Sequence, residues 1–168
     1  LMVAHRQSLD AVDDHNLMLG LDAAWRGKKV PLLIESFAMG SLTGARAPDP
    51  QPGVGGDGRG AFADKLAPGA GISAALRHEL VRPSVRYVYL HPQLRGDLGF
   101  FRRVGIQRAQ GDFELVPRIG QHGITQISVG SYGEVMATSE ADRVVEYEAG
   151  GFSQLKWDNG SSAGFYAG

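Results

Sequence analysis

The chain has 168 residues, of which 43% are hydrophobic and 21% charged, with a formal net charge of −1. This composition is typical of a folded protein with one core, and it lacks the basic excess of a dedicated nucleic-acid binder. Cysteine is absent, which excludes disulfides, thiolate nucleophiles and Cys-ligated metal sites.

The apolar runs are short. None approaches the roughly 18 residues of a membrane-spanning helix, and the N-terminal residues do not follow the pattern of a signal peptide. We therefore expect no membrane partner, and the compartment stays open. Glycine, with 24 residues, is about twice as frequent as usual, which favours tight turns and extended segments over a helical bundle.

The first 43 residues predict helices. Ser8 is a typical helix N-cap, and Met18, Leu21 and Trp25 lie on one face of a helix that Gly27 would end. A second helix is expected over residues 32–39, although the three apolar residues at its start fit a buried strand equally well.

Residues 44–60 are rich in proline and glycine, which is typical of a flexible arm or linker. Helices are expected again over residues 61–83. The better of them covers residues 72–81, with apolar residues at four-residue spacing, and stops before Pro83.

The C-terminal half, residues 84–168, predicts a series of short strands. Asp158-Asn159-Gly160 is a strong hairpin signal, because Asn and Gly accept the positive φ of tight turns. The stretch Val129–Ala137 resembles the glycine-rich loop of protein kinases, and a hairpin turn between two strands explains it more simply. The predicted strands are 85–90, 113–116, 124–129, 134–137, 143–147 and 152–157.

Together these elements predict a single α+β domain over residues 1–168. An antiparallel, twisted sheet or partly closed barrel in the C-terminal half would be packed by the N-terminal helices. The predicted core consists of apolar residues of the strands: Leu90, Val88, Leu115, Ile127, Val129, Val145, Tyr147, Leu155 and Trp157.

One pattern points to catalysis. Glu146-Tyr147-Glu148 is similar to the Glu-x-Glu signature of arginine-specific ADP-ribosyltransferases, with Arg86 in the place of that family's upstream arginine. The resemblance implies that one glutamate handles the nicotinamide ribose and the other assists the acceptor. The segment 125–128 matches the family's Ser-Thr-Ser strand only faintly. A water-facing strand surface explains the two carboxylates without any chemistry, since residues i and i+2 of a strand point the same way.

The histidines show no metal-ligand spacing, and no cofactor is expected. Phe100, Phe101, Arg102, Arg103 and Arg108 form a basic-aromatic patch, which we interpret as a core-edge segment with paired arginines.

Two functions remain open. The first is a non-enzymatic structural or interaction module, a self-associating subunit of a larger assembly such as a phage or secretion particle. The absence of cysteine, the glycine-rich sheet and the long arm support the structural module. A charge split, with a basic excess over residues 84–118 and an acidic excess over 119–168, supports self-association. The second is a small ADP-ribosyltransferase-like or hydrolytic enzyme that uses Glu146, Glu148 and Arg86.

Overall fold

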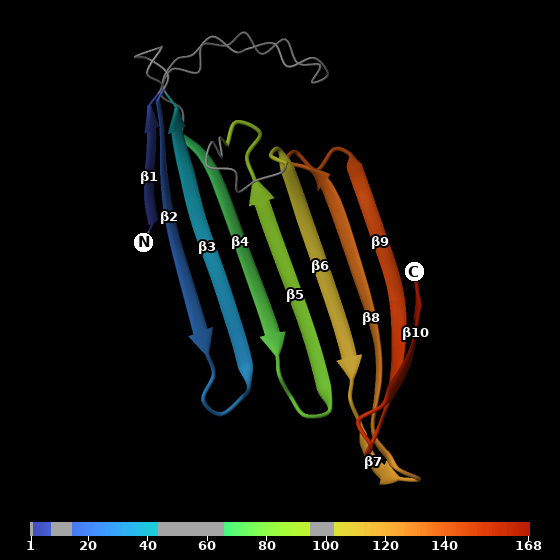
Figure 1. The fold of residues 1–168 in the computed structure, drawn as a ribbon. Helices are drawn as coiled ribbons and strands as arrows, with labels where there is room; N and C mark the ends of the chain where they lie inside the picture. Colours follow the sequence, from blue (N-terminus) through green and yellow to red (C-terminus); the bar gives the residue numbers. More distant parts are fainter. Residues whose placement is uncertain (1, 8–14, 44–65, 95–102) are drawn as a thin grey trace.

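The computed structural model describes residues 2–7, 15–43, 66–94 and 103–168, and these residues form a single antiparallel sheet of ten strands. No helix occurs among them (Figure 1). The predicted α+β class is therefore wrong, because this part of the chain is all-β. The predicted arm, residues 44–60, and the expected N-cap Ser8 lie outside the described residues.

The strands follow one another across the sheet in chain order, except that the short β7 pairs only with β8. The bounds are β1 Met2–Gln7, β2 His15–Arg26, β3 Leu32–Thr43, β4 Leu66–Leu76, β5 Val81–Leu90, β6 Ile106–Leu115, β7 Arg118–Gln121, β8 Ile124–Thr138, β9 Val144–Trp157 and β10 Ser162–Ala167.

The predicted N-terminal helices are strands because their apolar residues alternate. In β2, Leu17, Leu19, Leu21 and Trp25 recur at every second or fourth position, so one side of a strand carries them all. The segment predicted as helix 32–39 is part of β3, in agreement with the alternative of a strand. The predicted helix 72–81 is the end of β4, a turn and the start of β5.

The predicted C-terminal strands are confirmed, but two pairs of them are continuous. Residues 124–129 and 134–137 belong to β8, and residues 143–147 and 152–157 belong almost entirely to β9. The predicted turn at Gly130–Gly133 is wrong, since β8 runs straight through it. The hairpin at Asn159-Gly160 is confirmed. Gly160 has φ +83°, and the backbone N–H of Trp157 donates to the carbonyl of Ser161 at 2.9 Å.

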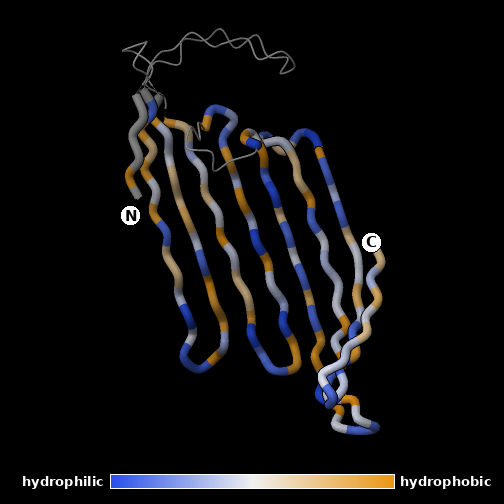
Figure 2. Tube along the Cα trace, in the orientation of Figure 1, coloured by the Kyte–Doolittle hydropathy of each residue, from blue (hydrophilic) through white to orange (hydrophobic). Residues whose placement is uncertain are grey.

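The sheet has two chemically different faces. The strand register places every Asp, Glu, Lys and Arg of β2–β6 and β8–β10 on the same side. Figure 2 shows how polar and apolar residues alternate along these strands. We call this side the charged face and the opposite side the uncharged face. The charged face carries Asp22, Arg26, Glu35, Arg82, Arg86, Arg108, Asp112, Glu114, Glu134, Glu146, Glu148 and Lys156.

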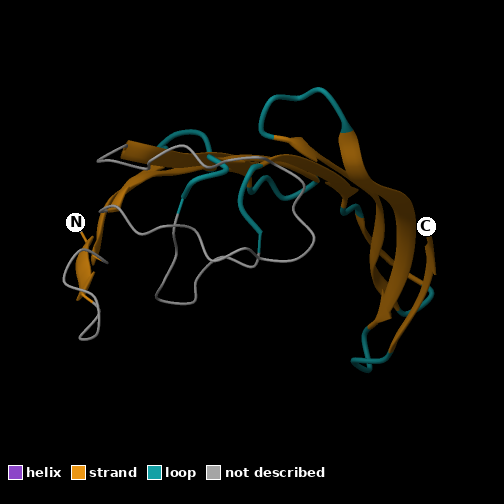
Figure 3. Cartoon of the chain, turned by 90° about the horizontal axis from the view of Figure 1, so that it is seen from above, coloured by secondary structure: helices purple, strands orange, loops and turns teal. Residues whose placement is uncertain are grey.

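The sheet is arched, with loop segments inside its hollow (Figure 3). Leu94, in the loop after β5, packs against Leu90 and Ala67 on the charged face, so the charged face is the concave one.

The buried core is small. The buried hydrophobic residues lie on the charged face or in adjoining loops: Met18, Ala67, Leu90, Leu94, Val116 and Met136. Of the predicted core, Leu90 is buried, and Val88 packs beside it. The other predicted core residues lie on the uncharged face and are not buried: Leu115, Val129, Val145 and Tyr147 are exposed, and Ile127, Leu155 and Trp157 are only partly buried. Tyr147, for example, is 81% exposed.

Candidate functional site

The uncharged face is the most unusual surface of the molecule. Large apolar side chains stand exposed on it in every strand from β2 to β10 except β3 and the short β7. They include Leu19, Leu21, Trp25, Leu66, Ile72, Val85, Tyr87, Phe113, Leu115, Val129, Val135, Val144, Val145, Tyr147 and Phe165. A contiguous apolar surface of this kind marks a contact with another apolar phase.

The strands that form this face are long. β2 to β6 have 10 to 12 residues each, and β8 and β9 have 15 and 14. Strands of globular proteins most often have about 5–6 residues. The two ends of the sheet also differ. β3 and β5 finish, and β4 and β6 begin, at the same end (Figure 1), so the two longest intervals between consecutive strands both start and finish there.

Ion pairs between neighbouring elements characterise the charged face. Arg108 Nη2 lies 2.5 Å from Glu134 Oε2, and Arg103 Nη1 lies 3.2 Å from Glu146 Oε2. The hydrogen bond to Glu134 raises the pKa of Arg108 above its ordinary value. Arg103 and Arg108 were expected to be paired, and both are. The rest of the predicted basic-aromatic patch, Phe100 to Arg102, lies outside the described residues.

The candidate catalytic residues are not brought together. Glu146 is engaged by Arg103, and Glu148 accepts a hydrogen bond of 3.1 Å from the hydroxyl of Tyr132, which raises the pKa of that tyrosine. Arg86 shares their face, but it stands on β5, and β6 and β8 separate it from β9. Both glutamates therefore stand on an open sheet face.

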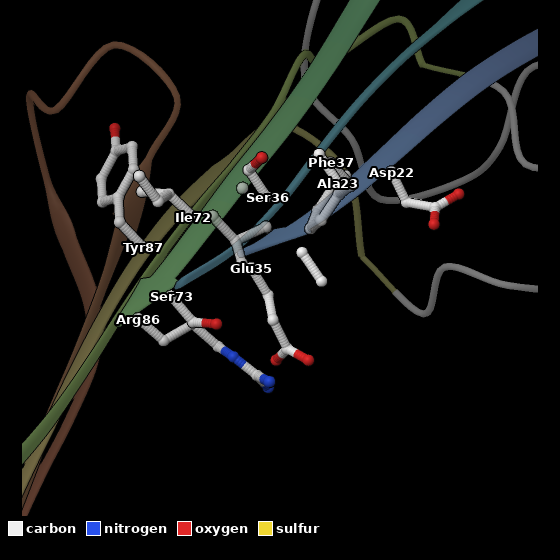
Figure 4. A pocket seen from close by; sticks show the side chains of 12 residues that line it. Asp22, Ala23, Glu35, Ser36, Phe37, Ile72, Ser73, Arg86 and Tyr87 are labelled. Atoms are coloured by element: carbon white, nitrogen blue, oxygen red, sulfur yellow. The ribbon is translucent and has the colours of Figure 1, made fainter. Parts of the chain in front are cut away.

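Arg86 instead lines a shallow cavity of about 390 Å³ with residues of β2, β3 and β4 (Figure 4). Asp22 and Glu35 supply two carboxylates, and Phe37 supplies an aromatic wall. Sequence reasoning missed this group, because Asp22 and Glu35 fell within segments predicted as helices. The alternation of apolar residues in β2 was the signal that could have revealed it.

A second, wider depression of about 710 Å³ lies over β4, β5, β6, β8 and β9. Its side chains belong to the uncharged face, with Tyr87 and Tyr147 at the same register level and Gly111 and Gly133 between the larger residues.

Among the described residues, no group of three His, Cys, Asp or Glu side chains is placed to hold a metal ion. A search of the same residues for a helix long and apolar enough to cross a membrane found none. Comparisons of the chain with protein families, with curated proteins and with solved structures found no match.

Proposed function

We propose that the chain is a non-enzymatic structural module of a membrane. Its uncharged face lies against lipid acyl chains, and its charged face meets water. The expectation of a structural module is retained, whereas the expectation of no membrane partner is replaced.

The observation that carries the proposal is the separation of charge between the two faces. In a sheet that folds in water, the exposed face is polar and the covered face is apolar. Here the apolar face is exposed and has no charged residue in any strand from β2 to β10 apart from β7, which lies off the main path. Lipid is the environment that stabilises such a surface, because apolar side chains are more stable among acyl chains than in water.

The strand lengths agree with this environment. A tilted strand crosses the hydrocarbon layer with about 9–11 residues, and β2 to β6 have 10 to 12. Antiparallel sheets that cross membranes also combine short turns at one side with longer loops at the other. The two longest intervals between consecutive strands both start and finish at one end of the sheet, which fits that pattern.

The proposal includes self-association, because backbone groups need hydrogen-bond partners inside lipid. The outer edges of β1 and β10 pair with no other described strand. A second copy of the chain would supply such partners.

The two tryptophans of the sequence test the lipid contact directly, because Trp25 and Trp157 both belong to the uncharged face. We would reconstitute the chain in vesicles whose acyl chains carry bromine, and measure tryptophan fluorescence. Brominated chains should quench strongly and aqueous iodide weakly. The variants Trp25→Phe and Trp157→Phe assign each signal. Strong quenching by iodide with none by bromine would refute the proposal.

A further inference from the structure

We propose that the charged face holds a binding site for a small zwitterion, a solute of the neutral amino-acid type. The site is the cavity that the Arg86 guanidinium and the carboxylates of Asp22 and Glu35 line together. The inference is independent of the proposed membrane role, because the site requires only a concave surface that faces water.

The strand register places these groups on both sides of a gap. Glu35 of β3 is opposite Ser73 of β4, and Ser73 is opposite Arg86 of β5. Two strand spacings, about 10 Å in total, therefore separate the backbones of Glu35 and Arg86. Ser73 is small, so the longer side chains extend over it, and Figure 4 shows the carboxylate and the guanidinium pointing toward one another.

The floor of the cavity is also made of small groups. Gly71 precedes Ser73 on the same face of β4, and the ring of Phe37 lies over the position that a Cβ of Gly71 would take. Asp22 is opposite Phe37, so its carboxylate stands beside the ring on the side away from β4. The cavity thus has an apolar wall beside its charged groups.

Three other arginines at this face are paired. On the same face, Arg82, Arg103 and Arg108 each lie within 4 Å of a glutamate oxygen. Within the part of the chain that the structure describes, Arg86 forms no ion pair with Asp22 or Glu35, although all three line one cavity. A ligand that carries both signs of charge satisfies all of them.

Each end of an amino acid has a matching group. The planar guanidinium of Arg86 can donate two parallel hydrogen bonds to a carboxylate. The carboxylates of Asp22 and Glu35 can accept from an ammonium group, which presents three donors. A simple anion would leave the two carboxylates without a cationic partner, and a simple cation would leave Arg86 without an anionic one.

The test is a titration of the full chain in detergent micelles with L-alanine, followed by NMR chemical shifts. Propionate and ethylamine, which each carry one of the two charges, serve as comparison probes. We expect saturable binding of L-alanine and at least tenfold weaker binding of either probe. Arg86→Gln and Glu35→Gln should each weaken the binding of L-alanine about tenfold, the loss expected from one charge-assisted hydrogen bond.

Lys156→Gln is the matched control, because it removes one positive charge of the same face outside the cavity. The affinity of this variant for L-alanine should stay within twofold of the affinity of the unsubstituted chain. The inference is overturned if L-alanine does not bind, if Arg86→Gln binds as tightly as Lys156→Gln while circular dichroism shows the sheet intact, or if propionate binds as well as L-alanine. Fluorescence quenching in vesicles reads out the lipid contact independently, so either proposal can fail while the other stands.

Discussion

Arg108 on β6 and Glu134 on β8 form an ion pair of 2.5 Å across the charged face, with Glu134 two residues along β8 from the residue directly opposite Arg108. Their side chains are 45% and 19% exposed, so water screens the attraction. We expect a double-mutant cycle with Arg108→Gln and Glu134→Gln to give a coupling of about 1 kcal/mol or less in the free energy of unfolding.

The pair of Arg82 with Glu114 is the control for this cycle, because it joins neighbouring strands of the same face at the longer distance of 3.6 Å. Its coupling should be smaller than that of Arg108 with Glu134. Equal or reversed couplings would show that the geometry of these pairs does not set their strength.

A second prediction compares the two faces at adjacent positions of β6. Ala109 lies on the uncharged face and Gln110 on the charged face. Ala109→Arg should lower the free energy of unfolding in vesicles by about 2–4 kcal/mol, the usual cost of arginine on a lipid-facing strand near the middle of the bilayer. Gln110→Arg should change it little. Denaturant unfolding in vesicles measures both, and equal losses would contradict the lipid contact.

A third prediction concerns two glycines of β8. A Cβ at Gly130 would lie 2.6 Å from the backbone oxygen of Phe113 and 2.5 Å from the ring of Phe152, whereas a Cβ at Gly133 would meet only the backbone oxygen of Glu148 at 3.9 Å. Gly130→Ala should therefore lower the free energy of unfolding by about 1–3 kcal/mol. Gly133→Ala, the control, should be neutral or slightly stabilising. A neutral Gly130→Ala would contradict the close packing of β8 and β9.

A fourth prediction is a pH dependence. Tyr132 donates a hydrogen bond to Glu148, which raises the pKa of Tyr132 above its ordinary value. Because the folded state then holds the phenol proton more tightly than the unfolded state, this contribution to stability is present below pH ~10 and is lost at higher pH. Glu148→Gln should move the ultraviolet titration of Tyr132 to lower pH, with Tyr132→Phe to identify its signal. An unchanged titration would show that the carboxylate does not hold the phenol.

The sequence alone was sufficient for the strands between turn signals, and insufficient where two periodicities competed. In β2, Met18, Leu21 and Trp25 fit a helix, while Leu17, Leu19, Leu21 and Trp25 fit a strand. Within this one segment the apolar residues support a helix and a strand almost equally. Pairing with β3 decides between them, because it satisfies the backbone groups of the whole segment.

The glycines of β8 led to the wrong prediction of a turn, for a different reason. Gly130 and Gly133 look like turn residues, but they are places where a neighbour approaches closely or a groove is left open. The core was wrong for a third reason. A residue such as Tyr147 is apolar whether it faces other side chains or an apolar surrounding, so hydrophobicity alone does not identify what covers it. The cavity at Arg86 depends on partners from β2 and β3 that only the register reveals.

The order of strands along the sheet has a consequence for how the molecule folds and unfolds. Every contact between described strands joins immediate neighbours in the sheet, and no strand reaches across to a distant one. Stability is then close to a sum of nearest-neighbour interactions, as in a one-dimensional lattice. Unfolding should therefore begin at an edge strand and proceed inward strand by strand, instead of involving the whole sheet at once. Folding by successive addition of hairpins would proceed in the opposite direction, with each new strand pairing with the strand formed before it.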